Sequence, residues 1–165
     1  VRRAIRWLHD HAADFGGDPD RLFLAGHSSG AHLAGVMLTT DWPNLGAPAD
    51  IIKGGLCISG MDDLKPVRLS ARSAYVTLDD DTEHAFSPQR HRANLRAPLL
   101  VANGTLETPE FLRHARDFAQ AVAASGKTVE RLVLDGYNHF EVLETLGNPY
   151  GILGRAVLAQ IAARE

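Results

Sequence analysis

The stretch LFLAGHSSGAHLAG, residues 22–35, constrains the fold most, because an apolar run passes through a serine flanked by glycines into a small-residue helical pattern. Ser28 is the centre of a G-x-S-x-G pattern, and Gly26 and Gly30 leave room where Cβ atoms would collide with neighbouring backbone. In a sharp strand-to-helix turn the central residue is strained, and its side chain stands at the carboxyl end of the sheet. The stretch therefore predicts a strand, a tight turn at Ser28 and a helix directly behind it.

The rest of the chain alternates between short apolar runs and helical patterns. Four strands are expected, at residues 21–25, 53–59, 98–103 and 129–134. The helical patterns cover residues 5–15, 30–40 and 109–125 and, as one or two helices, residues 142–161. This alternation predicts a single domain over residues 1–165 with an open, mostly parallel α/β sheet. Because the chain begins at Val1 inside a helical pattern and without a methionine, we expect a portion of a longer protein.

Two helices can be described further from their local patterns. Thr108 offers a hydroxyl N-cap, Pro109 and Glu110 suit the first turn, and Gly126 ends the helix. Apolar residues recur at helical spacing in both helices. In the first they are Ile5, Leu8, Ala12 and Phe15, and in the second Phe111, Ala115, Phe118, Ala119 and Val122.

The strand at residues 21–25 is expected to be buried.

A serine hydroxyl is a weak nucleophile without a base, and His139 is the candidate base. It follows the last strand, in the loop sequence DGYNHF. The alternative is a loop histidine held only by hydrogen bonds. His32 is expected to be a packed or pocket-edge residue, and the remaining histidines outside the turn are expected to face solvent: His9, His11, His84, His91 and His114.

The base needs a carboxylate that fixes its tautomer, and Glu107 is the preferred candidate. It lies four residues beyond the third strand, and the order serine, acid, histidine suits this fold. Asp62, after the second strand, is the alternative acid, whereas Asp135 is too near His139 in sequence. The backbone N–H of Ser29 is the expected oxyanion donor, because it begins the helix behind Ser28.

Residues 61–96 are polar and irregular, and we expect them to form a cap or pocket-lining insertion. Short helices are expected near residues 64–69 and 72–78. Four residues near the strand ends are expected to line the substrate pocket: His27, Met61, Asp62 and Asn138.

Composition excludes several functions. The net charge is −3 and the basic residues are scattered, so no nucleic-acid partner is expected. No apolar run approaches ~18 residues and no leader is visible, so no membrane partner is expected. The single cysteine, Cys57, fits a reducing, cytoplasmic location. No metal or organic cofactor is expected, because His9 and His11 point to different helix faces and phosphate-binding glycine patterns are absent.

Three segments resemble the α/β-hydrolase-fold serine hydrolases, and within them the arylformamidase (kynurenine formamidase) and esterase group. They are FGGDPDRLFLAGHSSGAHLAG, PLLVANGTLETPEF and GYNHFEVLETL. The resemblance implies Ser28, Glu107 and His139 as the catalytic triad. It also implies that this chain is the C-terminal portion of such a fold, with the N-terminal strands and their HGG-type oxyanion loop missing.

The leading hypothesis is a hydrolase that cleaves an aryl formamide resembling N-formylkynurenine, in tryptophan catabolism, or a small carboxylic ester. A general carboxylesterase of the same fold is the first alternative. A catalytically incomplete fragment or binding module is the second, since half of the oxyanion site is missing from the sequence. The expected partners are a small-molecule substrate and either a second copy of the chain or a complementing N-terminal segment.

Overall fold

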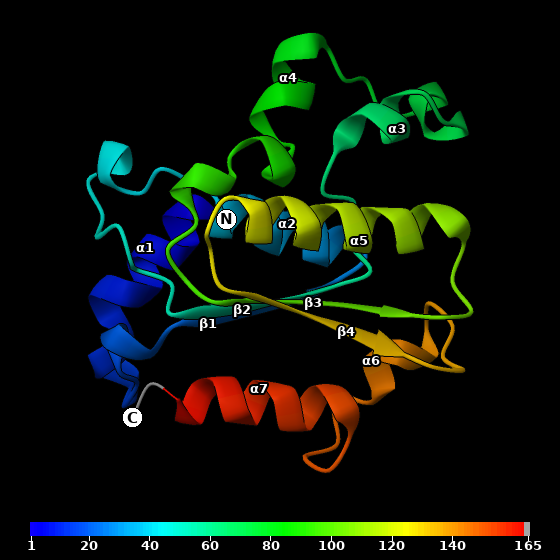
Figure 1. The fold of residues 1–165 in the computed structure, drawn as a ribbon. Helices are drawn as coiled ribbons and strands as arrows, with labels where there is room; N and C mark the ends of the chain where they lie inside the picture. The colour runs from blue at the N-terminus through cyan, green and yellow to red at the C-terminus, as the bar shows by residue number, and fades with distance from the viewer. Residues whose placement is uncertain (164–165) are drawn as a thin grey trace.

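In the computed structural model, which describes residues 1–163, the described chain folds around a parallel sheet with helices on both faces (Figure 1). The strands lie in the order β1-β2-β3-β4, with every neighbouring pair parallel. They are β1 (Phe23–His27), β2 (Gly54–Ile58), β3 (Leu99–Gly104) and β4 (Val129–Leu134). The expected α/β sheet is confirmed. Because the strands are parallel, their four carboxyl ends lie on the same side of the sheet.

Two layers of helices bury the two faces of this sheet. Figure 1 shows α2 (Ser29–Leu38) and α5 (Pro109–Ala124) on one face, and α6 (Glu141–Glu144) and α7 (Ile152–Ala162) on the other. Successive residues of β2 serve opposite faces. Cys57 packs in the cluster beneath α2 and α5, whereas Leu56 and Ile58 pack in the cluster over α7.

The first strand differs from its prediction. β1 begins two residues later than expected and continues to His27, and its residues are half-buried or exposed instead of buried. The physical reason is its position at the edge of the sheet, where its one partner among residues 1–163 is β2. Helix α1 (Arg2–His11) lies at the same end of the sheet. Of the apolar positions in this region only Ile5 and Ala12 are buried, while Leu8 and Phe15 are exposed.

Helix α5 follows its predicted boundaries, with two differences. Thr108 is the N-cap residue, but its side chain makes no capping hydrogen bond. His114, which we expected to face solvent, is 2% exposed. It lies one position before Ala115 and four before Phe118, on the buried side of the helix.

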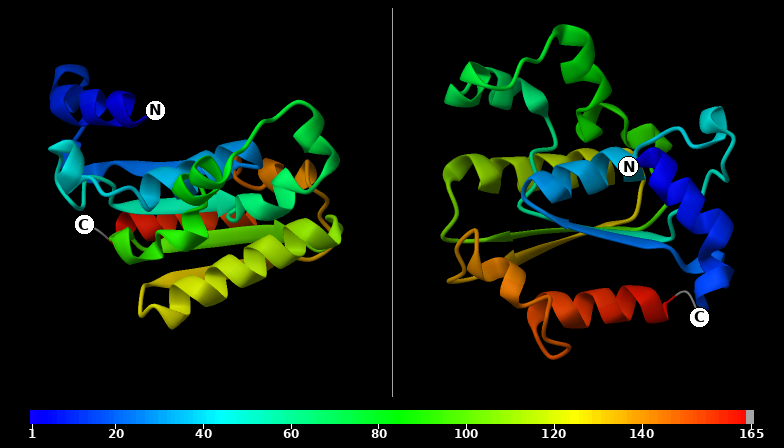
Figure 2. Two further views of the ribbon diagram at one scale, coloured as in Figure 1. Left: turned by 90° about the horizontal axis from the view of Figure 1, so that it is seen from above. Right: turned by 180° about the vertical axis from the view of Figure 1, so that it is seen from behind.

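Leu95 belongs to the core cluster beneath α2 and α5, whereas residues 61–90 form a separate layer above these helices (Figure 2). It contains α3 (Leu64–Arg68) and α4 (Asp80–Ala85); the helix expected at residues 72–78 is reduced to a short 3-10 turn at Ala71–Ala74. Helix α4 was not predicted, because residues 79–81, in the segment expected to be irregular, form a helix start. Asp79 Oδ1 accepts a hydrogen bond from the backbone N–H of Thr82, 2.7 Å away. Further 3-10 helices lie at Ala12–Phe15, Pro19–Arg21, Pro43–Leu45, Pro88–Arg90 and Arg92–Asn94.

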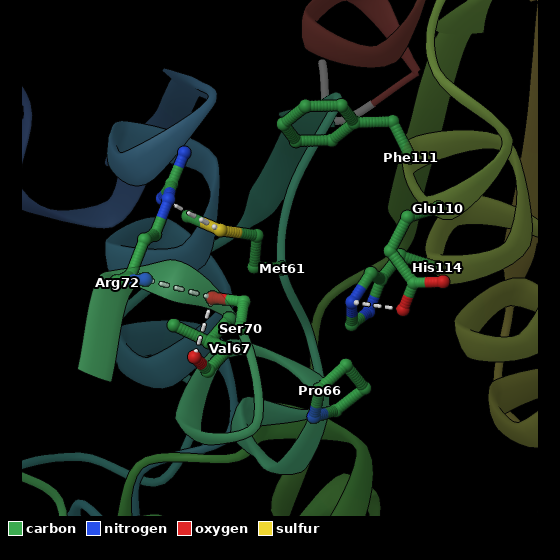
Figure 3. A pocket seen from close by; sticks show the side chains of 8 residues that line it. All are labelled: Met61, Pro66, Val67, Ser70, Arg72, Glu110, Phe111 and His114. Carbon is green, nitrogen blue, oxygen red and sulfur yellow. Dashed lines mark hydrogen bonds and ion pairs between the residues drawn. The ribbon is translucent and has the colours of Figure 1, made fainter. Parts of the chain in front are cut away.

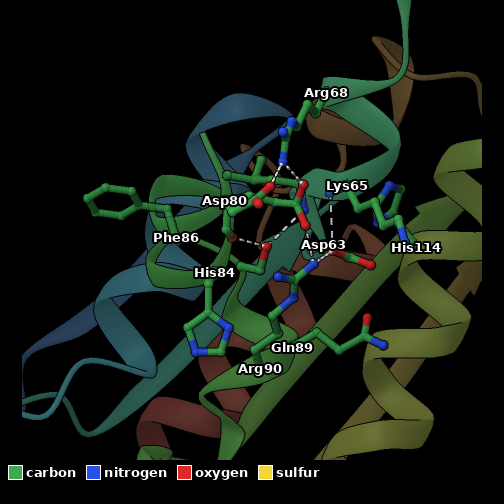
Figure 4. Close-up of polar contacts among 12 residues, drawn as sticks. Asp63, Lys65, Arg68, Asp80, His84, Phe86, Gln89, Arg90 and His114 are labelled. Atoms are coloured by element: carbon green, nitrogen blue, oxygen red, sulfur yellow. Dashed lines mark hydrogen bonds and ion pairs between the residues drawn. The ribbon is translucent and has the colours of Figure 1, made fainter. Parts of the chain in front are cut away.

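Ion pairs hold this layer together (Figure 4). Glu83 is 7% exposed and receives Arg90 Nη2 at 2.6 Å on one carboxylate oxygen and Arg68 Nη1 at 3.2 Å on the other. Arg90 also pairs with Asp63 at 3.0 Å, and Arg68 with Asp80. Because Glu83 is buried and receives both arginines, this network joins α3 and α4 more firmly than exposed ion pairs would.

Candidate active site

The turn after β1 holds Ser28 in a strained backbone conformation. Its φ of 57° lies in the left-handed region that a non-glycine residue rarely adopts. The Ser28 N–H donates to Ile58 O at 2.9 Å, and α2 begins at the next residue. A Cβ on Gly26 would lie 2.1 Å from Gly30 O, so the turn requires glycine there. A Cβ on Gly30 would meet no atom within 4 Å, so our expectation that both glycines provide space holds only for Gly26.

The structure brings Ser28, His139 and Glu107 into one hydrogen-bonded chain. His139 Nε2 lies 3.0 Å from Ser28 Oγ, and His139 Nδ1 lies 2.8 Å from Glu107 Oε2. Each side chain follows the carboxyl end of a different strand, β1, β4 and β3 respectively. Parallel pairing therefore places together residues that are 111 and 32 positions apart in sequence.

Glu107 is held by more than the imidazole. Its side chain is fully buried, and Oε1 accepts hydrogen bonds from Ser59 Oγ at 2.6 Å and from Gly104 N at 2.8 Å. Ser59 follows β2 and has a φ of 54°, the second positive φ of a non-glycine residue in the described chain. Sequence reasoning missed Ser59, although its position directly after an apolar strand and before Gly60 was an available signal.

Two rings pack against His139 and restrict its motion. His27 Nε2 lies 2.7 Å from the backbone oxygen of His139, and the two rings are 4.6 Å apart. Phe111, from the first turn of α5, stacks on the imidazole with ring centres 4.4 Å apart. His27 and Phe111 therefore both lie beside the His139 ring, and the helical pattern of residues 109–125 alone could not assign Phe111 to this place.

The alternative acids lie elsewhere. Asp62 is 1% exposed and makes no hydrogen bond to His139, whose Nδ1 is bonded to Glu107. Burial raises the pKa of Asp62 to about 8, and its Oδ1 has no hydrogen-bond partner among the described residues. Asp135 accepts a hydrogen bond from Thr105 Oγ1 at 3.1 Å. The geometry thus favours Glu107 over Asp62 and Asp135 as the carboxylate that pairs with His139.

A cavity of about 130 Å³ lies between residues 61–72 and the start of α5 (Figure 3). Met61 lines it, whereas the other three residues that we expect in a substrate pocket, His27, Asp62 and Asn138, do not. Asn138 instead lies just before α6, where its Oδ1 accepts hydrogen bonds from the N–H groups of Phe140 and Glu141. Phe111 belongs both to the cavity wall and to the stack on His139.

Residues 1–163 lack two kinds of feature. No helix in this range combines the length and the apolar character needed to cross a membrane. The same residues hold no group of three or more His, Cys, Asp or Glu side chains placed to bind a metal ion.

These features of the sheet and the site together define the α/β-hydrolase fold. They are a parallel sheet, a strained serine between a strand and a helix, and a buried acid and a histidine at the carboxyl ends of the strands. Residues 1–75 match the carboxylesterase family. The chain is 28% identical to kynurenine formamidase of Danio rerio over 145 residues, covering 85% of this chain and 49% of that protein. It is 29% identical to kynurenine formamidase of Salmo salar, covering 76% and 44% respectively. The chain thus spans about half the length of these curated relatives.

Solved structures agree with the assignment of the α/β-hydrolase fold. A proposed thioesterase from a Silicibacter species superimposes with a TM-score of 0.77 at 26% identity, over 95% of this chain and 56% of that chain. Carboxyl esterase 2 of Tuber melanosporum has a TM-score of 0.74 at 16% identity, over 99% and 59%, and shows the shared fold. Together these comparisons show that the chain has the α/β-hydrolase fold and that it is similar to esterases and kynurenine formamidases.

Proposed function

We propose that Ser28, His139 and Glu107 form the catalytic triad of a serine hydrolase that cleaves an aryl formamide or a small carboxylic ester. The observation that carries the proposal is the hydrogen-bonded chain from Ser28 Oγ through the imidazole to a buried carboxylate. A histidine held in this way can accept the serine proton, while the carboxylate stabilises the imidazolium that forms.

The reaction follows from the positions of these atoms. His139 Nε2 takes the proton of Ser28 as Oγ attacks the carbonyl carbon of the substrate. The backbone N–H of Ser29, at the start of α2, is a donor for the resulting oxyanion. The imidazolium then protonates the leaving amine or alcohol, and the bond from the carbonyl carbon to it breaks. Water, activated by His139, releases formate or a carboxylic acid from Ser28.

The comparisons support both substrate classes. The kynurenine formamidases match over three quarters or more of the chain, which favours a formamide. The carboxylesterase match over residues 1–75 favours an ester, and a general carboxylesterase is the second candidate. In either case residues 61–96 would act as the cap that lines the pocket, since Met61 and Arg72 line the same cavity as Phe111, whose ring stacks on His139.

Labelling with a fluorophosphonate probe tests the proposal, because the probe reacts with an activated serine. We expect a single labelled peptide containing Ser28, loss of labelling in Ser28→Ala, and retained labelling in Ser29→Ala. A chain that is folded but not labelled would instead support the binding-module alternative. Turnover of formanilide against phenyl acetate then separates a formamidase from a general carboxylesterase.

A further inference from the structure

The side chain of His27 joins two parts of the site that come from opposite edges of the described sheet. His27 ends β1 and directly precedes Ser28, whereas His139 lies in the loop after β4. The strand order places β2 and β3 between them. His27 Nε2 nevertheless lies 2.7 Å from the main-chain oxygen of His139, 112 positions away in sequence. The residue next to the proposed nucleophile is therefore bonded to the backbone of the proposed base.

The main chain of His27 is itself fixed in place. His27 lies opposite Ile58 in the register of β1 and β2, and the N–H of Ser28 donates to Ile58 O at 2.9 Å. The positive φ of Ser28 begins the turn at the same point. The His27 side chain thus extends from a backbone that cannot shift without disturbing the turn that holds Ser28.

The loop that carries His139 is attached to the end of β3 before it reaches the base. Leu106 N donates to Tyr137 O at 3.0 Å, and Glu107 then orients the imidazole through its Nδ1. His27 adds a bond to the main chain of residue 139 itself, and this bond comes from the side of β1. A shift of ~1 Å between reacting groups can lower turnover by ~10²-fold, so a bond at this point bears on the rate.

The partners of the two rings determine where each carries its hydrogen. A carbonyl oxygen only accepts hydrogen bonds, so Nε2 of His27 is the donor and the neutral ring has its lone pair on Nδ1. In His139 the arrangement is reversed, because Nδ1 faces the Glu107 carboxylate and Nε2 faces Ser28 Oγ. Two rings with centres 4.6 Å apart thus hold opposite tautomers. His27 Nε2 is not available as a base, since it donates to His139.

We propose that His27 is a positioning residue, whose Nε2–H holds the main chain of His139 so that the imidazole stays within reach of Ser28 Oγ. The inference rests on the proposed function and deepens it, by naming a residue that couples the nucleophile turn to the loop of the base. His27 does not line the cavity between residues 61–72 and α5. Its loss should therefore lower the rate of reaction and leave substrate binding unchanged.

The rate at which a fluorophosphonate labels Ser28 tests the inference, together with kcat and KM for phenyl acetate. His27→Phe keeps a ring beside His139 but has no donor. We expect about tenfold slower labelling and about tenfold lower kcat with unchanged KM, the size expected for one lost hydrogen bond. His27→Gln, whose amide N–H can replace Nε2–H, should recover both rates to within about threefold of the unmodified protein.

His11→Phe is the matched control. His11 Nδ1 lies 2.8 Å from Trp7 O on α1, and the two rings are stacked 4.6 Å apart. This variant therefore also removes a contact between a histidine and a carbonyl oxygen, but away from the site. It should be labelled at the rate of the unmodified protein, and circular dichroism should show that all three variants are folded.

The ¹⁵N resonances of the histidine rings test the geometry without any variant. At high pH, where the rings are neutral, we expect the hydrogen on Nε2 in His27 and on Nδ1 in His139. A hydrogen on Nδ1 of His27 would overturn the inference, because Nε2 could then not donate to a carbonyl oxygen.

The labelling outcomes separate this inference from the proposed function. Labelling of His27→Phe as fast as the unmodified protein contradicts the inference alone, because Ser28 is then activated without the hydrogen bond. Equally slow labelling of folded His27→Phe and His27→Gln also contradicts it, since ring packing and not the hydrogen bond would then hold His139. An unmodified protein that is folded but not labelled contradicts the proposed function, and the inference with it.

Discussion

His139 Nδ1 lies 2.8 Å from Glu107 Oε2, while the other oxygen of that carboxylate is held by Ser59 and by the backbone of Gly104. A carboxylate fixed at both oxygens holds the imidazole in one orientation, with Nε2 directed at Ser28. It also selects the tautomer in which Nε2 can accept the serine proton. The effects expected of changes at Glu107 and at Ser59 rest on the rigidity of this acid.

Glu107→Gln should reduce turnover of an activated ester by ~10⁴-fold while the protein stays folded. A glutamine amide would donate to Nδ1, which forces the ring hydrogen onto Nε2 and removes the base. Steady-state kinetics, with circular dichroism to verify folding, measure the effect. Asp62→Asn, at the alternative acid, is the control and should change turnover by only a few fold. A larger loss for Asp62→Asn than for Glu107→Gln would show that the acid is misassigned.

Ser28→Ala should lose about 10⁴-fold or more in turnover, because it removes the proposed nucleophile. Ser29→Ala should be far milder, since Ser29 is expected to act through its backbone N–H. The two variants are compared by kcat with the same ester. Losses of similar size would mean that Ser28 is not the reacting residue of the turn.

Ser59→Ala should lower kcat about tenfold with little change in KM, because Glu107 loses one of three hydrogen bonds but stays in place. It should also destabilise the fold by ~1–3 kcal/mol, the cost of leaving a buried acceptor less well satisfied. Ser73→Ala, on the exposed 3-10 turn, is the matched control for a serine hydroxyl removed elsewhere. Unchanged kinetics for Ser59→Ala would show that Ser59 does not position the acid.

Asp62→Asn should change how stability depends on pH. The pKa of Asp62 is raised from its ordinary 3.8 to about 8 in the folded chain, so between these values the unfolded chain releases a proton that the folded chain keeps. The free energy of unfolding therefore falls as pH rises through this window, by at most ~1.4 kcal/mol per pH unit from this group.

The asparagine variant lacks this contribution. Its stability relative to the unmodified chain should increase between pH 4.5 and pH 8, as measured by urea unfolding. Asp14→Asn, at an exposed position, is the control and should follow the unmodified chain. Parallel curves for Asp62→Asn and the unmodified chain would contradict a protonated Asp62.

Residues 1–165 should self-associate or require a complementing segment, and alone they should hydrolyse esters poorly. β1 pairs only with β2 among the described strands, and an open strand edge invites another chain. Trp7, Leu8 and Phe15 add exposed apolar surface near that edge. Light scattering should give a mass above the 17.9 kDa of one chain, and Leu8→Glu should reduce it. A stable monomer with full turnover would refute this prediction.

The sequence by itself determined the alternation of strands and helices, the turn at Ser28 and the meeting of Glu107 and His139 with that turn. These follow from local rules: apolar periodicity, glycine where backbone comes close, and position after a strand. The tertiary structure decided that β1 lies at an edge, that His114 is buried and that Ser59 holds Glu107. Burial and hydrogen-bond partners depend on which segments pack together across long sequence separations, and no local pattern in one sequence contains that information.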